Sequence, residues 1–208
     1  MNDMNAEFRR QSRRLFAVLR AIVRRSTDSA SSTGDYAARL EGRIGALARV
    51  HDMFLRAPDD GVDLEEMVRA ELLAQAIPAA RCRISGPDTR ICGEAPLPLA
   101  LTLHELGVNA LVHGAFLGAG GTLDVSWSYA QRDGREWLRL IWQECDATPR
   151  ANPQSTKGFG MELIESMLPY ELDAGTRVSW LEPGARIEIE IPANHRAVFW
   201  SPGERVAM

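Results

Sequence analysis

Three polar side chains recur every fourth residue in the segment LALTLHELGVNALVHGA, at Glu105, Asn109 and His113. In an α-helix, residues four apart lie on the same face, so a carboxylate, a carboxamide and an imidazole would form one row. Oxygen ligands of this kind suit a hydrated Mg²⁺ ion, which in proteins is usually accompanied by phosphate. An exposed polar face without a ligand is the alternative interpretation, and the row considered alone favours it.

Two glycines, Gly158 and Gly160, precede a second apolar helical pattern in the segment GFGMELIE. Glycine lets the backbone turn tightly and approach a ligand, and the free N–H groups at the start of a helix attract anions. Lys157 adds a positive charge beside them. These features suit a phosphate group, although a GxG sequence before a helix is more often only a turn.

A third candidate is Glu144, which ends the alternating strand pattern EWLRLIWQE. A carboxylate at the end of a strand accepts hydrogen bonds, and the amino group of adenine is a suitable donor. A solvated carboxylate is the more common outcome when such a position is considered alone.

The elements that must position these residues follow from the hydrophobic periodicity of the chain. Apolar residues recur with helical spacing from Phe8 to Val23 and again from Tyr36 to Phe54, which predicts a helical hairpin in residues 1–62. Neither helix is apolar all round, and together they make a thin core. We therefore expect two hairpins to form a four-helix bundle in a homodimer.

From Asp63 onward the pattern changes, and residues 63–194 are expected to form an α+β domain with a mixed, largely antiparallel sheet and helices on one face. Asp63 and Glu66 resemble a capping box that starts a helix through about Ala76. Residues 195–208 are predicted to be a tail.

Four strands of this domain are predicted to form two β-hairpins. TLDVSWSY and EWLRLIW alternate around the turn sequence QRDG, and RVSWLE and ARIEIEIP alternate around PG. The segments RCRIS and TRIC are predicted to be short strands around a GPD turn.

The composition of the 208-residue chain is that of a globular protein. Hydrophobic residues make up 45% and charged residues 25%, so we expect a packed core rather than global disorder. No apolar run approaches the roughly 18 residues of a membrane span, and we expect no secretion signal. The three cysteines lack CxxC spacing, which disfavours metal binding and disulfides and favours reduced thiols in the cytoplasm.

The order of these parts resembles the GHKL ATP-binding fold, and in particular the HWE group of histidine kinases. The resemblance is carried by His104 in HELGVNALVHGA and by the triplet of Trp142, Gln143 and Glu144, which match the His and the Trp-x-Glu that name the group. The phrases LARVHDMFLR and GPDTRI extend the resemblance over almost the whole chain.

The resemblance implies an ATP-binding, two-component signalling protein. It implies that Asn109 coordinates Mg²⁺, that Glu105 is the catalytic residue that orients or polarises groups nearby, and that Glu144 contacts adenine. The family usually has a lysine where this chain has a histidine after the Asn-bearing helix. The other ATP-binding positions that the resemblance implies are His113, Gly114, Lys157, Gly158 and Gly160.

The chain departs from the family at the phosphoacceptor. In the family the first hairpin helix carries a phrase similar to Glu-Leu-x-His-Arg-x-x-Asn, and EFRRQSRR matches its first two positions with Glu7 and Phe8. Arg10 stands at the histidine position and Arg14 at the asparagine position. A guanidinium stays protonated and cannot act as the nucleophile towards ATP, which predicts a degenerate kinase.

The same helix is strongly basic, with seven arginines between positions 9 and 25 in a chain of net charge −4. The receiver domains of response regulators bind this hairpin in the family and offer an acidic pocket. Charge complementarity then predicts that such a receiver domain docks on the basic helix. The docking residues that we expect are Arg9, Arg10, Arg13 and Arg14.

Other functions stay open. The chain could instead be an active kinase that uses another acceptor, such as His51, or a separate protein substrate. Nucleic-acid binding through the basic helix is less favoured, because no aromatic platform or recognition motif accompanies the arginines. The simplest alternative is a solvated basic face that has no partner.

Overall fold

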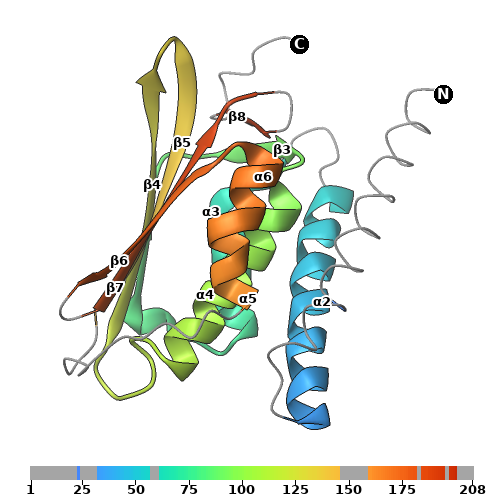
Figure 1. Ribbon diagram of the computed structural model, residues 1–208, viewed down its shortest axis with the longest axis vertical. Coiled ribbons are helices and arrows are strands. Elements are labelled where there is room, and N and C mark those ends of the chain that lie inside the picture. Colours follow the sequence, from blue (N-terminus) through green and yellow to red (C-terminus); the bar gives the residue numbers. More distant parts are fainter. Residues whose placement is uncertain are drawn as a thin grey trace.

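The computed structural model describes residue 23 and residues 32–56, 61–145, 159–181, 184–194 and 197–200. In these parts of the chain a long helix, α2 (Thr33–Arg56), lies beside a mixed α+β body (Figure 1). The α+β fold class predicted from the sequence is therefore confirmed. Several predicted functional positions lie outside the described residues: Arg9, Arg10, Arg13, Arg14, Lys157 and Gly158.

The main sheet has five strands in the order β2-β4-β5-β7-β6. Strand β2 pairs with β4 in parallel, and the other neighbours pair antiparallel, so the sheet is mixed and largely antiparallel, as predicted. The bounds of the strands, in chain order, are β2 Cys82–Ser85, β4 Thr122–Arg132, β5 Arg135–Cys145, β6 Gly175–Leu181 and β7 Gly184–Pro192.

Both predicted hairpins are present in this sheet. The β4–β5 turn consists of Asp133 and Gly134, whose φ angles of 53° and 71° are typical of the two-residue turns that match strand twist. This turn fixes the register of the long ladder, which places Glu144 opposite Leu123. The second hairpin joins β6 to β7.

A smaller sheet has the order β1-β3-β8, with β1 Val62–Asp63, β3 Arg90–Gly93 and β8 Ala197–Trp200. Strands β2 and β3 were both predicted, but they belong to different sheets and do not pair with each other. Strand β8 lies in the segment predicted to be a tail. It pairs with β3, and its Phe199 is buried, because alternate residues of this short strand face the core.

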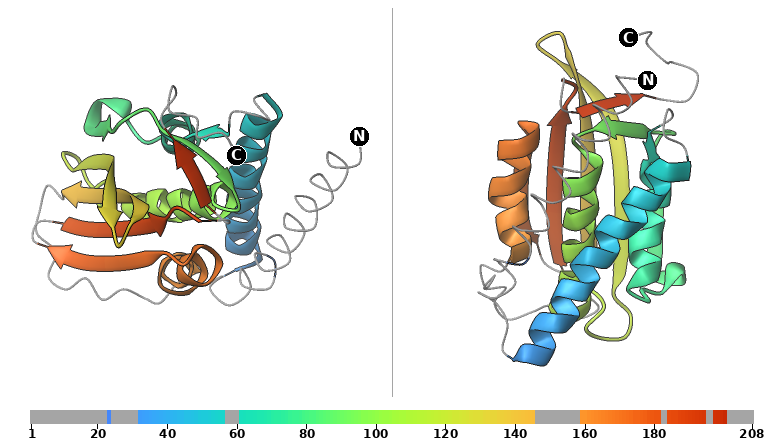
Figure 2. Two further views of the ribbon diagram at one scale, coloured as in Figure 1. Left: turned by 90° about the horizontal axis from the view of Figure 1, so that it is seen from above. Right: turned by 90° about the vertical axis from the view of Figure 1, so that its right-hand side faces the viewer.

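Three helical stretches cover one face of the five-stranded sheet, and α2 lies on their far side (Figures 1 and 2). They are α3 (Leu64–Ala74), α4 (Pro96–Val112) and a run from α5 (Phe159–Glu162) through a π-helical turn into α6 (Leu168–Leu172). The predicted cap of α3 is confirmed, since the Asp63 side chain accepts a hydrogen bond from the Glu66 N–H at 2.8 Å.

An apolar stripe of α4 forms the centre of the core. Its members are at most 2% exposed, and they belong to the same cluster as buried side chains of β4, β5 and β7. Burying one such leucine stabilises a fold by roughly 1.5–3 kcal/mol relative to leaving it in water. The stripe consists of Leu99, Leu103, Leu106 and Ala110. It fixes which face of α4 turns away from the sheet.

Helix α2 packs against α4 through its own apolar stripe. Ala46, Leu47 and Val50 are almost fully buried, and Leu47 clusters with Leu101 of α4 and Leu163 of the helical run. Two larger apolar side chains on α2, Ile44 and Leu55, remain exposed. None of the described helices combines the length and the apolar composition that crossing a membrane requires.

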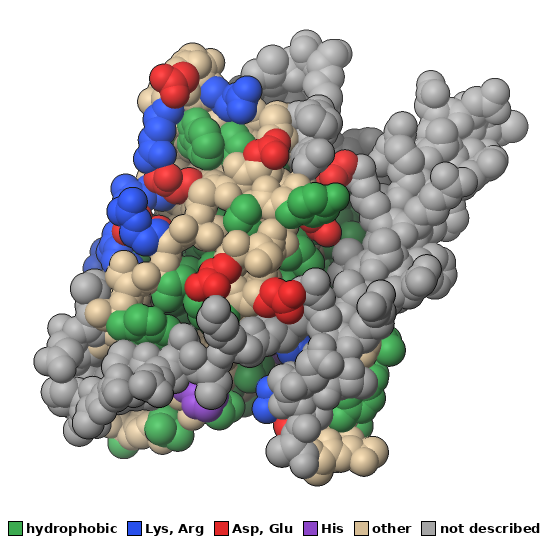
Figure 3. All heavy atoms as spheres, in the orientation of Figure 1, with side chains coloured by type: hydrophobic (Ala, Val, Ile, Leu, Met, Phe, Trp, Pro, Cys, Tyr) green, Lys and Arg blue, Asp and Glu red, His purple; other side chains and the backbone are tan. Residues whose placement is uncertain are grey.

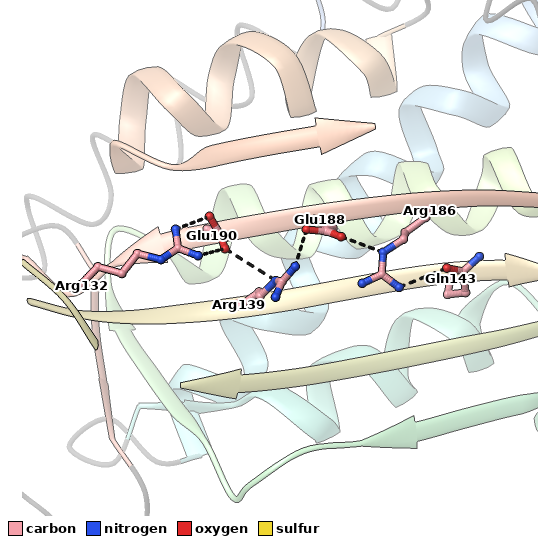
Figure 4. A network of polar contacts seen from close by, with 6 residues as sticks. All are labelled: Arg132, Arg139, Gln143, Arg186, Glu188 and Glu190. Carbon is pink, nitrogen blue, oxygen red and sulfur yellow. Dashed lines mark hydrogen bonds and ion pairs between the residues drawn. The ribbon is translucent and has the colours of Figure 1, made fainter. Parts of the chain in front are cut away.

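Charged side chains on the surface are grouped by element (Figure 3). Arginines gather on the side of the sheet, whereas acidic side chains lie over the helical run from α5 to α6, in which Glu162 and Glu165 are exposed. A chain of ion pairs between arginines and glutamates runs along the outer face of β5 and β7 (Figure 4). This face carries polar side chains because it is not covered by helices.

Candidate functional site

Helix α4 carries Glu105, Asn109 and His113 in one row that runs from the interior to the surface. Glu105 is 7% exposed, Asn109 is half-buried, and His113 is the exposed C-cap of the helix. The His113 N–H still donates to the Asn109 carbonyl at 2.8 Å, but the backbone of His113, with φ −128° and ψ −14°, is no longer helical. Solvent exposure therefore increases along the row from Glu105 to His113.

Gly160 of α5 lies against the middle of this row. A Cβ atom on Gly160 would come within 3.0 Å of Glu105 Cβ and 3.1 Å of Asn109 Nδ2, which is tighter than ordinary van der Waals contact. Only glycine allows α5 to approach α4 this closely without displacing those side chains. The structure thus brings together three predicted site residues, Glu105, Asn109 and Gly160, from distant parts of the sequence.

Glu144, at the end of β5, is 4% exposed, and its carboxylate accepts hydrogen bonds from its own strand and from the segment after α4. The Ala115 N–H donates to Oε2 at 2.9 Å, and the Trp142 indole N–H donates to Oε1 at 3.0 Å. The arrangement joins the Trp-x-Glu triplet to the segment that follows α4.

That segment, the α4–β4 loop (residues 113–121), depends on Gly114. A Cβ atom on Gly114 would collide with Glu144 Oε2 and with Ala110 of α4. Gly114 was predicted to be an ATP-binding position. In the structure it packs closely against the carboxylate of Glu144. Any larger residue would push the loop away from Glu144.

Arg81 holds the same loop from the other side. Its guanidinium donates to the carbonyls of Gly121, Ala115 and Gly118 at 2.6, 3.1 and 3.1 Å, and it lies 4.8 Å from the centroid of the Phe116 ring. No local sequence pattern indicates this role, because Arg81 stands at the start of a short strand pattern. The loop is therefore clamped between Arg81 and Glu144.

His104, the histidine of the HWE motif, is buried between α4 and α3. Its Nδ1 lies 3.5 Å from Glu71 Oε2 and 3.4 Å from Gln75 Nε2. Arg49 of α2 donates two hydrogen bonds to Glu71, at 2.7 and 2.9 Å. Burial by itself would raise the pKa of Glu71, but the bonds from His104 and Arg49 lower it overall below 4.5. His104 is thus part of a hydrogen-bonded junction of three helices.

Arg43 of α2 is a site residue that the sequence analysis missed. It is 1% exposed, and its Nε and Nη2 donate to Glu105 Oε1 and Oε2 at 2.7 and 3.3 Å. A signal was present in the sequence, because Arg43 stands at helical spacing with the buried Leu47 and Val50. A charged residue in an apolar stripe indicates a buried partner.

The residues present fit a Mg²⁺ ion that is bound together with phosphates. Within the described residues, no group of three His, Cys, Asp or Glu side chains could hold a metal ion alone. Mg²⁺ commonly keeps several waters and takes only one or two protein oxygens beside substrate phosphates, which suits the single carboxamide of Asn109. Because Gly160 has no side chain, the backbone of α5 comes close to that carboxamide.

Comparison with known proteins agrees with this arrangement. The family model described as HWE histidine kinase matches residues 8–88. A blue-light-activated histidine kinase of Rhizobium johnstonii is 34% identical over 183 residues, which cover 88% of this chain and 51% of the relative. Blue-light-activated histidine kinase 1 of Erythrobacter litoralis is 29% identical, with 91% and 52% covered. The chain spans about half the length of these relatives.

The fold is similar to that of solved histidine kinases. The Erythrobacter litoralis EL346 blue-light activated histidine kinase matches with a TM-score of 0.64 and 18% identity, over 88% of this chain and 59% of that one. The histidine kinase domain of EL346 matches with a TM-score of 0.57 and 21% identity, over 74% of each chain. At these identities the structures establish the fold alone. Taken with the family model and the 34% identical relative, they show that the chain belongs to the HWE histidine kinase family.

Proposed function

We propose that the chain is an ATP-binding regulator of a two-component system, a degenerate kinase that docks on a response regulator. The observation that supports ATP binding best is the convergence of Gly160 on Glu105 and Asn109. In this proposal Asn109 holds Mg²⁺, Glu105 orients groups beside it, and Glu144 accepts from the adenine amino group. Mg²⁺ would neutralise phosphate charge there and link it to the protein.

The remaining contacts to ATP are proposed for both ends of this site. His113 and Gly114 would lie at the open end of α4, where His113 is exposed. Lys157, Gly158 and Gly160 would lie along the phosphates, with backbone N–H groups as donors. The clamped α4–β4 loop keeps the residues at the end of α4 in a fixed position, so that binding does not have to order them.

The loss of autophosphorylation is proposed from the sequence of the first helix. Arg10 occupies the position of the phosphoacceptor histidine, and its guanidinium is not a nucleophile. The receiver domain of a response regulator would instead bind the basic face. The acidic pocket of a receiver suits the charges of Arg9, Arg10, Arg13 and Arg14.

The organisation of the protein is proposed as two functional regions. Residues 1–62 would form the docking and dimerisation hairpin, with Ile44 and Leu55 of α2 contributing exposed apolar surface to a homodimer. Residues 63–194 would form the ATP-binding domain. The thiols of Cys82, Cys92 and Cys145, which are not joined in disulfides, favour a cytoplasmic location.

An active kinase is the second candidate, and membership of the HWE histidine kinase family favours it. Such a kinase would use another acceptor, for which His51 on α2 is half-buried, or a separate protein substrate. Both candidates require ATP binding and differ only in the fate of the γ-phosphate.

Isothermal titration with Mg²⁺ and ATP tests the feature that both candidates share. Asn109→Ala should weaken ATP binding at least about tenfold, since a hydrogen bond or ligand to a charged group contributes roughly 1.5–3 kcal/mol. Gln131→Ala is the matched control, because it removes an exposed carboxamide at the tip of the β4–β5 hairpin. Wild-type protein that binds no ATP, or an Asn109→Ala variant that binds it unchanged, would refute the proposed site.

A further inference from the structure

The buried ion pair between Arg43 and Glu105 joins the nucleotide site to a different part of the fold. Arg43 belongs to α2, whereas Glu105 and Asn109 belong to α4. The side chain of Arg43 is 2% exposed and that of Glu105 is 9% exposed, so water screens this pair very little. The two charges therefore neutralise each other locally.

Glu105 needs such a counter-charge because of what lies next to it. Its Oε2 is 3.4 Å from where a Gly160 Cβ would be, and the same Cβ position is 3.1 Å from Asn109 Nδ2. The Glu105 carboxylate thus lies beside Gly160, along which the proposed function puts the phosphates. An unpaired, buried carboxylate there would repel a polyphosphate, whereas the ion pair with Arg43 carries no net charge.

Arg43 comes to this site as part of a docked helix. Leu47, one turn further along α2, packs on Leu101 and Leu163. Arg49 of α2 forms a second ion pair with the rest of the fold, to Glu71. Separation of α2 from α4 would remove Arg43 from Glu105 in the same step. The charge at the nucleotide site therefore depends on whether α2 is docked.

We propose that Arg43 is the residue through which α2 controls nucleotide affinity: while α2 is docked, Arg43 neutralises Glu105, and ATP binds tightly only in that state. The coupling is reciprocal, so bound ATP stabilises the docked position of α2. This inference rests on the proposed function, since it requires ATP beside Asn109. It makes the hairpin region a component of the nucleotide site rather than only a docking surface.

Titration of Mg²⁺ and ATP into the wild-type protein and four variants tests the charge argument. Arg43→Met should weaken binding at least tenfold, and adding Glu105→Gln to it should restore the affinity to within threefold of wild type, because the repelling charge is then gone. Arg49→Met is the matched control: it removes the ion pair between α2 and Glu71 but leaves Glu105 paired, so its affinity should fall clearly less than that of Arg43→Met. Arg43→Lys keeps a positive charge and should lie between wild type and Arg43→Met, and it replaces Arg43→Met if that variant does not fold.

Hydrogen exchange of the α2 amides gives a readout independent of activity. ATP should slow exchange in α2 of wild type and of Arg49→Met, but not in Arg43→Met. Unchanged affinity in Arg43→Met, failure of Glu105→Gln to restore it, or an equal loss in Arg49→Met would overturn the inference while leaving ATP binding intact. Wild-type protein that binds no ATP would instead overturn the proposed function, and this inference with it.

Discussion

The Trp142 indole donates a hydrogen bond to the carboxylate of Glu144, two residues later in β5. Residues two apart in a strand point to the same face, and here that face is the core, where Trp142 is fully buried. The Trp-x-Glu spacing thus allows one side chain to orient the other. The second carboxylate oxygen is left to hold the α4–β4 loop through the Ala115 N–H.

Trp142→Phe should therefore loosen Glu144 as well as destabilise the fold. The smaller phenyl ring fills less of the buried site and a buried carboxylate oxygen loses its donor, so we expect a loss of roughly 1–3 kcal/mol in the free energy of unfolding. Urea denaturation measures this loss. Trp180→Phe, at a side chain that is 46% exposed, should change stability by less than about 0.5 kcal/mol. Equal effects of the two substitutions would contradict the role assigned to the indole N–H.

Gly160→Ala tests the approach of α5 to α4. The added Cβ would press on Glu105 and Asn109, so ATP affinity should fall by about tenfold, or roughly 1.4 kcal/mol. Gly118→Ala is the control, because nothing lies within 4 Å of its added Cβ. Equilibrium binding of a fluorescent ATP analogue compares the two. If both variants bind like wild type, Gly160 does not border the nucleotide.

Arg81→Met should release the α4–β4 loop. The substitution removes the hydrogen bonds from the guanidinium to three loop carbonyls, and we expect a loss of about 2–3 kcal/mol in stability. Hydrogen exchange should become faster at Ala115, whose N–H is bound by Glu144. Arg83→Met, at an exposed side chain 3.8 Å from Asp124, should leave both quantities almost unchanged.

The chain of ion pairs on the outer face of the sheet should make the free energy of unfolding depend on pH under acidic conditions (Figure 4). Hydrogen bonds from Arg139 and then Arg186, each 2.7 Å long, lower the pKa of Glu188 from 4.5 to about 2. Because the folded-state pKa is depressed, this stabilisation is fully present above pH 4.5 and is lost as pH falls from about 4.5 towards 2.

Glu188→Gln should accordingly lower the free energy of unfolding by about 1 kcal/mol at pH 7, and by progressively less as the pH approaches 2. Urea denaturation at a series of pH values measures the difference between variant and wild type. Glu65→Gln breaks an exposed pair within α3 and should cost less than about 0.5 kcal/mol at any pH. A difference for Glu188→Gln that does not shrink in acid would show that its carboxylate charge is not what stabilises the sheet.

Local patterns predicted much of this fold. The Asp133-Gly134 turn, the Asp63 cap and the apolar stripe of α4 each depend on residues close in sequence. Pairings between distant segments could not be predicted in the same way. Strands β2 and β3 are neighbours in the chain but join different sheets, and β8 is too short for its alternation to stand out.

The same distinction applies to the candidate site. The row of Glu105, Asn109 and His113 follows from helical spacing within a single segment. The partner of Glu105 is Arg43, which lies 62 residues earlier, and no local pattern connects the two. The bond from the Ala115 N–H to Glu144 likewise joins a loop to a strand 29 residues away. Contacts of this kind depend on how the helices and the sheet pack together.

Incubation of the purified protein with Mg²⁺ and γ-labelled ATP tests the central claim most directly. A degenerate kinase with Arg10 at the acceptor position should bind ATP but acquire no acid-labile, base-stable label. Label of that kind, absent from an Asn109→Ala control, would contradict the account and show a working histidine kinase. His51→Ala would then identify whether the histidine on α2 is the acceptor.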